Sequence, residues 1–89
     1  MVSQKTKVIN KEGFHMRPAH YFTVEMSAFK SSVIIVYNGR NADAKRMMPI
    51  ISARIKCGSE IEIQCSGEDE NAALARAVEL VETGLGEKV

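Results

Sequence analysis

The sequence has 89 residues and balances 12 Lys and Arg against 11 Asp and Glu, which leaves a net charge of +1. A charge so close to zero excludes a general attraction to nucleic acid or to an anionic membrane, so any binding site has to be local. No run approaches the roughly 18 apolar residues that cross a bilayer, and the first residues lack the apolar core of a signal peptide. We therefore expect one cytoplasmic domain over residues 1–89 with a modest hydrophobic core.

The first part of the chain predicts a strand, a loop and a helix. Residues 5–9 alternate between polar and apolar side chains, as a strand does, and residues 10–13 read as a loop. Apolar side chains then recur at spacings of three and four, which predicts a helix over residues 16–29 with one buried face. We assign that face to the core, and it consists of Ala19, Phe22, Met26 and Phe29.

The segment 13–19, which reads Gly-Phe-His-Met-Arg-Pro-Ala, lies where this helix should begin. Pro18 suits the first turn, because the N–H that it lacks would have no helical partner there. The free N–H groups and the dipole at a helix start attract anions, and the Arg17 guanidinium matches phosphate oxygens. A histidine in such a place is often an ordinary surface residue. The combination predicts a histidine, His15, beside a phosphate site formed by Arg17 and the helix N-terminus at Pro18.

The middle of the chain predicts a hairpin. Residues 33–37 form a continuous apolar, β-branched run, which is typical of a central strand. Asn38 and Gly39 follow, and this pair favours a two-residue turn in which both positions have positive φ. The return strand over residues 40–44 is short and polar, as expected at the edge of a sheet.

The second half predicts a helix, a strand and a helix. Residues 45–56 carry an apolar stripe at helical spacing, with Pro49 in the first turn and Gly58 as a plausible stop. Residues 60–65 alternate cleanly, which predicts a strand with Ile61, Ile63 and Cys65 inward. Residues 66–69 resemble a helix start with acidic side chains at the positive end of the dipole. The last helix should end near Gly84 and bury Leu74, Ala77, Val78 and Val81.

The resulting order is β-α-β-β-α-β-α, an α+β pattern. Its apolar faces are all buried if a four-stranded antiparallel sheet is covered on one face by three helices. RNA-recognition and ferredoxin-like domains share much of this order, but an RNA-recognition sheet needs exposed aromatic side chains on its central strands. The predicted return strand has none. Cys57 and Cys65 form no metal-binding spacing, so we expect reduced thiols and neither a metal nor a cofactor.

The segment around His15 resembles the active-site motif of HPr, the histidine-containing phosphocarrier of the bacterial phosphoenolpyruvate-dependent sugar phosphotransferase system. The resemblance runs from Lys5 to residues 84–87 and implies an open-faced β-sandwich. It also implies that Nδ1 of His15 accepts a phosphoryl group from enzyme I and passes it to an enzyme IIA domain, with Arg17 contacting the phosphoryl oxygens. The chain would then be a monomeric carrier, not an enzyme.

Protein partners need a docking surface beside the histidine, and methionine suits a surface that meets several of them. We expect this surface to consist of Met16, His20, Met47, Met48 and Ile51 if the first two helices pack together, as they do in the family. The alternative is that the Met47–Ile51 stripe belongs to the core. His20 is not expected to act as a second acid or base.

The sequence departs from the family pattern at Arg46. Many relatives have a regulatory serine at this position. A serine kinase cannot phosphorylate arginine, so we do not expect this chain to be controlled by serine phosphorylation. The main alternative function is a regulatory or nitrogen-related paralogue that uses the same phosphohistidine for signalling. RNA binding and an inert binding domain are more remote alternatives.

Overall fold

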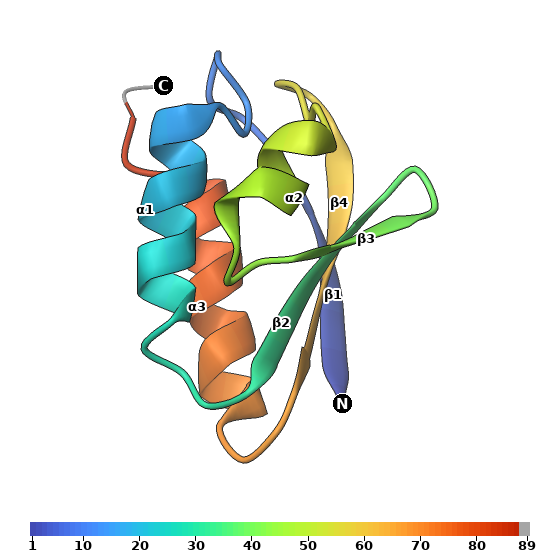
Figure 1. The fold of residues 1–89 in the computed structure, drawn as a ribbon, viewed down its shortest axis with the longest axis vertical. Coiled ribbons are helices and arrows are strands. Elements are labelled where there is room, and N and C mark those ends of the chain that lie inside the picture. Colours follow the sequence, from blue (N-terminus) through green and yellow to red (C-terminus); the bar gives the residue numbers. More distant parts are fainter. Residues whose placement is uncertain (88–89) are drawn as a thin grey trace.

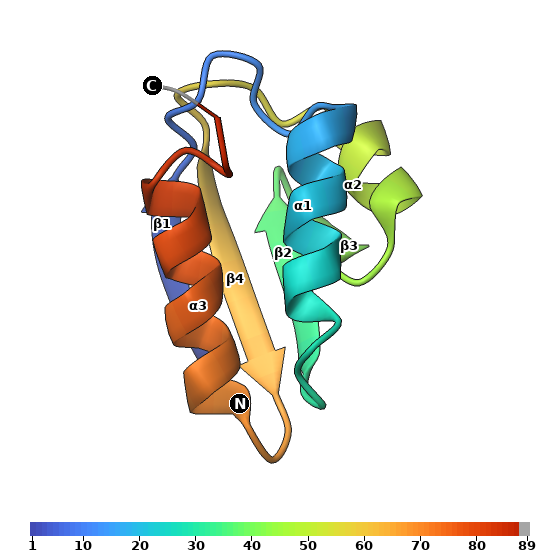
Figure 2. The ribbon, with the colours of Figure 1, turned by 90° about the vertical axis from the view of Figure 1, so that its left-hand side faces the viewer.

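The computed structural model describes residues 1–87, and it contains four strands and three helices in the order β-α-β-β-α-β-α. The strands form one antiparallel sheet in the order β1-β4-β2-β3. All three helices lie on the same face of this sheet (Figures 1 and 2). The predicted α+β architecture, an antiparallel sheet with one open face, is therefore confirmed. The bounds are β1 Val2–Lys7, α1 Met16–Met26, β2 Ser32–Tyr37, β3 Arg40–Asp43, α2 Met47–Ser52, β4 Glu60–Ser66 and α3 Glu70–Glu82.

The hairpin and the central strands form as predicted. Asn38 and Gly39 have φ values of 51° and 75°, as a turn with two positive φ angles requires. β3 pairs with β2 alone and so forms one edge of the sheet. The alternation in β4 buries Ile61, Ile63 and Cys65 against the helices. Because alternate side chains point to opposite faces, β2 and β4 present aliphatic and polar groups on the open face, Ile34 and Val36 beside Gln64 and Glu62.

The core lies between the sheet and the helices. Phe22 and Met26 of α1 and Ala77 and Val81 of α3 are fully buried there, as predicted. Leu74 of α3 and Phe29, which follows α1, lie at the margin of the core and are only partly buried. The core thus fixes α1 and α3 on the sheet, and α1 in turn positions the segment that precedes it.

The first strand and the first helix differ from their predicted bounds. β1 spans Val2–Lys7 instead of residues 5–9, because it pairs with β4 from Val2 opposite Cys65 to Lys7 opposite Glu60. Long-range pairing therefore sets the length of β1. α1 ends at Met26 and not at Phe29. Its end is marked by Ser27, whose hydroxyl donates to the carbonyl oxygen of Thr23 at 2.8 Å.

The second helix is shorter than predicted. α2 spans Met47–Ser52 instead of residues 45–56, and it has Pro49 in its first turn as expected. It ends well before Gly58, because Arg54 adopts a left-handed conformation with φ of 54° two residues beyond the last helical residue. α2 packs beside α1 near its start, as the family resemblance implied (Figure 1).

The acidic residues lie at the start of α3, as predicted, and Asp69 makes a further set of contacts. α3 begins at Glu70, and Asp69 at its N-cap makes no side-chain capping bond. The Asp69 carboxylate instead accepts hydrogen bonds from the backbone N–H groups of Lys30 and Ser31, at 2.9 and 2.8 Å, and from the Ser31 hydroxyl. These donors stabilise the charged form and lower the pKa of Asp69 from 3.8 to about 2, with the Ser31 hydroxyl as the largest cause.

The two thiols are separate. Cys57 is exposed in the turn before β4, whereas Cys65 is buried in the strand, and both are free. Burial, followed by the nearby charges of Glu70 and Asp69, raises the pKa of the Cys65 thiol. A buried thiol with a raised pKa is unreactive, in agreement with the predicted reduced cysteines.

Candidate functional site

The loop that carries His15 is fixed by hydrogen bonds and by one glycine. The Asn10 side-chain amide, which is fully buried, donates to the carbonyl oxygen of Gly13 at 2.7 Å. The N–H of Phe14 donates to the carbonyl oxygen of Ile55 at 3.0 Å. Gly13 has φ of 63°, and a Cβ there would lie 2.3 Å from that same oxygen of Ile55. Residue 13 must therefore be glycine, and the chain reaches His15 along a defined path.

His15 is the N-cap residue of α1. Its backbone is extended, with φ of −73° and ψ of −177°, and its carbonyl oxygen accepts the N–H of Ala19 at 2.9 Å. The imidazole makes no capping hydrogen bond, and 63% of the side chain is exposed. The first N–H groups of α1, which have no helical partners, therefore lie next to an imidazole ring that is exposed to solvent.

Arg17 and Pro18 occupy the first turn of α1, where the sequence placed them. Pro18 is the third helical residue and is buried, and its missing N–H costs no helical hydrogen bond. The Arg17 side chain is exposed, and it makes no ion pair with any acidic side chain of residues 1–87. Its five N–H donors are thus available to an anion in the hollow that Arg17 and His15 both line.

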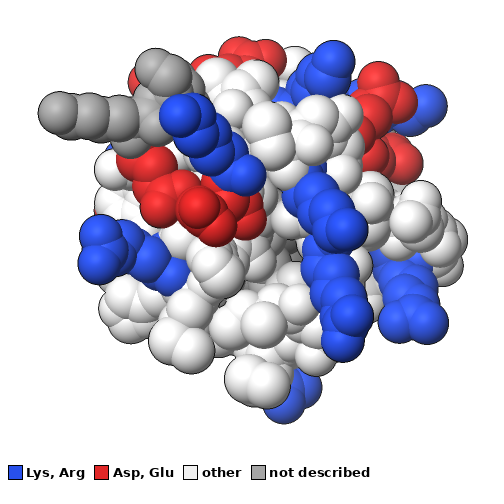
Figure 3. All heavy atoms as spheres, turned by 90° about the horizontal axis from the view of Figure 1, so that it is seen from above, with Lys and Arg blue, Asp and Glu red and all other residues white. Residues whose placement is uncertain are grey.

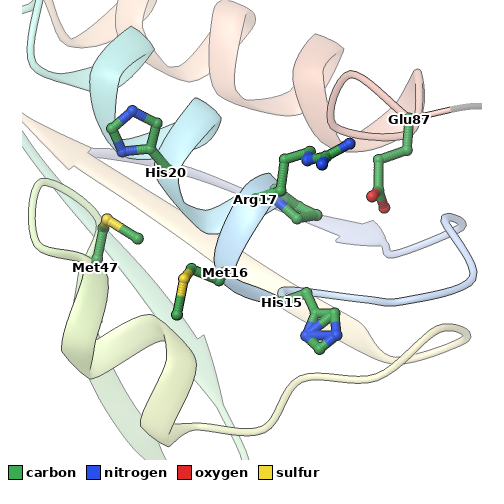
Figure 4. A pocket seen from close by; sticks show the side chains of 7 residues that line it. His15, Met16, Arg17, His20, Met47 and Glu87 are labelled. Carbon is green, nitrogen blue, oxygen red and sulfur yellow. The ribbon is translucent and has the colours of Figure 1, made fainter.

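An open hollow of about 600 Å³ brings most of the predicted residues together. Figure 4 shows the lining side chains, which come from α1 and the residue before it, from the start of α2 and from the segment after α3. The His15 and His20 rings stand apart in this view. The lining residues are His15, Met16, Arg17, Pro18, His20, Met47 and Glu87.

Two residues of the predicted docking surface do not line the hollow. Met48 lies outside the hollow, although it is 65% exposed. Met16 lines the hollow and is 68% exposed. Ile51 is partly buried and packs against the core, as the alternative reading allowed. Arg46 precedes them as the exposed N-cap of α2, with no side-chain capping bond. Met16 is therefore the most exposed apolar residue of the hollow, and Met48 is an exposed apolar residue of α2 outside it.

Glu87 is the residue of the hollow that sequence reasoning missed. Its Oε1 accepts a hydrogen bond from the Asn10 amide at 2.8 Å, so the segment after α3 is tied to the loop before His15. The two residues are 77 positions apart in sequence, so no local sequence pattern predicts the contact. A buried asparagine in a loop is the signal that could have pointed to a distant partner.

Glu12 is the other carboxylate near the ring. Its Oε2 lies 3.4 Å from Nε2 of His15, between side chains that are 62% and 63% exposed. Glu12 contacts Nε2 and not Nδ1, the other ring nitrogen.

Charges of both signs surround the site. Figure 3 looks onto the end of the molecule at which α1 begins, and it shows basic and acidic side chains with uncharged surface between them. Among residues 1–87 there is no group of three or more His, Cys, Asp and Glu side chains that could hold a metal ion. No helix in that range is long and apolar enough to span a membrane. The arrangement offers an exposed imidazole, a guanidinium group and an apolar rim.

Comparisons with known proteins agree with this geometry. The family model "PTS HPr component phosphorylation site" matches residues 2–83. HPr-like protein Crh of Bacillus subtilis is 35% identical over 82 residues, which are 92% of this chain and 96% of Crh. Phosphocarrier protein HPr of Haemophilus influenzae is 32% identical over 83 residues, 93% of this chain and 98% of that protein.

Solved structures are also similar. HPr-C-His from Thermoanaerobacter tengcongensis superposes with a TM-score of 0.95 at 30% identity, and the match covers 100% of both chains. An HPr dimer from the same organism matches with a TM-score of 0.77 at 31% identity, over 98% of this chain and 100% of that one.

Proposed function

The chain belongs to the HPr family of the phosphotransferase system, and from this membership we propose that it carries a phosphoryl group on His15. Enzyme I, charged by phosphoenolpyruvate, would donate the group, and enzyme IIA domains would accept it for sugar uptake. The observation that carries the proposal is an exposed imidazole at the N-cap of α1. Arg17 lies in the same hollow and makes no ion pair with an acidic side chain of residues 1–87.

In the proposed reaction, Nδ1 of neutral His15 attacks phosphorus and later returns the phosphoryl group to an acceptor. Arg17 contacts the phosphoryl oxygens, a charge-assisted interaction of roughly 1.5 to 3 kcal/mol, and the N–H groups at the start of α1 add roughly 0.3 to 1 kcal/mol. Stabilisation of this size holds the group without trapping it, as a carrier requires. No cofactor and no metal takes part in this proposal.

Partner proteins would dock on the apolar surface around the hollow. Met16 and Met48 are its most exposed apolar members, at 68% and 65%. Met47 and His20 border the hollow itself, so a partner seated there also covers His15. We propose a cytoplasmic carrier that works as a monomer, because both partners would use this one face in turn.

The test is to incubate the protein with enzyme I and phosphoenolpyruvate and to look for an acid-labile phosphate. The labelled protein is then offered a sugar-specific enzyme IIA domain. Transfer to that domain supports the proposal, whereas a protein that takes up no phosphate contradicts it.

A regulatory paralogue is the second candidate, and one observation favours it. The chain is 35% identical to Crh, and a solved structure of Crh describes it as a catabolite repression HPr. His15 and Arg17 serve a signalling carrier equally well. Offering the phosphorylated protein both sugar-specific and nitrogen-type acceptors distinguishes the two, because a paralogue of this kind would pass its phosphate to the nitrogen-type acceptor or to neither.

A further inference from the structure

The contact between Glu12 and His15 is not used by the proposed transfer reaction. Oε2 of Glu12 lies 3.4 Å from Nε2, the ring nitrogen that does not carry the phosphoryl group in that proposal. Glu12 is not among the residues that line the hollow, so its carboxylate approaches the ring from outside the site that receives the phosphoryl group.

The backbone between the two residues is held firmly. The N–H of Gly13 donates to the carbonyl oxygen of Asn10 at 3.0 Å, and the N–H of Phe14 donates to Ile55. The Phe14 ring is 3% exposed and meets Phe22 edge-on, with ring centroids 5.4 Å apart. Residues 13 and 14 are thus anchored, and Glu12 and His15 project from fixed points on either side of them.

The chemistry of the ring gives this contact a consequence. When Nδ1 bonds to phosphorus, the bond from phosphorus to the donor atom breaks and its electron pair stays on the donor. The ring then carries the phosphoryl group on Nδ1, a proton on Nε2 and a positive charge. In onward transfer the electrons of the N–P bond return to Nδ1, which leaves a neutral ring if the Nε2 proton is present. Without that proton an imidazolate anion would have to leave, which is much less favourable.

We propose that Glu12 is a positioning residue that keeps the proton on Nε2 of phosphorylated His15 and so speeds onward transfer. The inference rests on the proposed function and adds a residue to it. A carboxylate close to Nε2 favours the cationic ring. Among residues 1–87, the other charged or titratable groups that line the hollow with His15 are Arg17, which opposes this effect, Glu87 and His20.

The test uses the ¹⁵N-labelled protein phosphorylated by enzyme I and phosphoenolpyruvate. The pH titration of the Nε2 resonance is compared between the unaltered protein and Glu12→Gln, which keeps the shape of the side chain and removes its charge. We expect the midpoint of the titration to fall by roughly half a unit in the variant. Above the midpoint the protonated fraction then falls about threefold, and transfer and hydrolysis should slow by the same factor.

Two controls accompany this comparison. Glu68→Gln makes the same chemical change at an exposed carboxylate near Lys30, at the other end of α1, and should leave the midpoint unchanged. The His20 ring in each sample is an internal reference, because it makes no described contact with Glu12.

The outcomes separate this inference from the carrier function. If Glu12→Gln titrates and transfers like the unaltered protein, the role of Glu12 is refuted and the carrier function stands. A phosphoryl group found on Nε2 also refutes it, because Nε2 then has no proton to keep. If enzyme I does not phosphorylate the protein at all, the proposed function fails and the inference falls with it.

Discussion

The turn before α1 and the turn before α3, which meets the chain just after α1, are built alike but leave their side chains in different states. In each turn a glycine with positive φ lies against another backbone segment, Gly13 against Ile55 and Gly67 against Ser31. Each turn also has a polar side chain that joins distant segments, Asn10 at the site end and Asp69 at the far end.

The difference is what remains unpaired. At the far end the Asp69 carboxylate accepts hydrogen bonds from the backbone N–H groups of Lys30 and Ser31 and from the Ser31 hydroxyl. At the site end the Asn10 side-chain nitrogen donates to Gly13 and to Glu87, while His15 and Arg17 extend beyond this framework into solvent. The comparison teaches that the side chains proposed for chemistry do not hold the fold, so the chemistry can be removed while the fold remains.

The largest expected effect is the loss of phosphoryl acceptance in His15→Ala. The imidazole is exposed and makes no capping bond, so the free energy of unfolding should change by less than about 0.5 kcal/mol. Phosphate uptake from enzyme I should vanish, as measured with labelled phosphoenolpyruvate. His20→Ala is the matched control, and it should still be phosphorylated. If His15→Ala still took up phosphate from enzyme I, the side chains at the site end would not be those that carry the chemistry.

Gly13→Ala tests the framework of the site end. The new Cβ would meet the Ile55 oxygen at 2.3 Å, in a backbone conformation with φ of 63°. We expect a loss of roughly 2 to 4 kcal/mol in urea unfolding, together with slower transfer because His15 is displaced. Gly39→Ala is the control, since it has φ of 75° but no atom within 4 Å of the added Cβ. Equal losses in the two variants would show that the close approach to Ile55 is unimportant.

Arg17→Ala removes the cationic donor without touching the framework. Transfer should slow roughly 10- to 100-fold, the equivalent of one charge-assisted contact, while the urea midpoint stays unchanged. Arg40→Ala, at an exposed position in β3, should have no effect on either quantity. Unchanged transfer in Arg17→Ala would exclude Arg17 from the reaction.

Met48→Glu places a charge on the proposed docking surface. Met48 is 65% exposed, so stability should change little, whereas partner binding should weaken by about 1 to 2 kcal/mol in calorimetry. Val24→Glu is the control, because Val24 is an apolar residue of α1 that is 54% exposed and does not line the hollow. A loss of stability without a selective loss of binding would assign Met48 to the core instead.

The smallest expected effect is a change in the pH dependence of stability at the far end. The pKa of Asp69 is lowered from 3.8 to about 2 in the fold. Its contribution to stability is therefore present above about pH 4 and is lost as the pH falls through about 2. Asp69→Asn should flatten the decline of the urea midpoint between these values and leave transfer at neutral pH unchanged. If the urea midpoint of Asp69→Asn declined as steeply as that of the unaltered protein, groups other than Asp69 would set the loss of stability in acid. Glu68→Gln serves as the neighbouring control.

Local patterns predicted most of this fold. The turn at Asn38 and Gly39, the alternation of β4 and the place of Pro18 in the first turn of α1 depend on residues that are neighbours in sequence. The limits of β1 and α2 do not depend on such neighbours. The length of β1 is set by its pairing with β4, and α2 ends two residues before Arg54, which is left-handed. A non-glycine residue in that conformation has no reliable sequence signal.

The candidate site was predicted in part for the same reason. Residues 13–19 are contiguous, so the motif itself indicated His15, Arg17 and Pro18. Glu87 enters the hollow through a contact with Asn10 across 77 positions, and Asp69 binds Ser31 across 38. Such contacts exist only once the elements have packed. The sequence therefore predicted a helix start at residues 66–69, but neither the contact between Ser31 and Asp69 nor the place of Glu87.

The most direct test of the central claim is to locate the phosphorus atom in protein charged by enzyme I and phosphoenolpyruvate. Nitrogen–phosphorus coupling in the NMR spectrum of the ¹⁵N-labelled protein identifies the bonded atom. The account predicts a single phosphoryl group on Nδ1 of His15, with the His20 ring unmodified. Phosphorus on His20, or on any side chain other than His15, would contradict it.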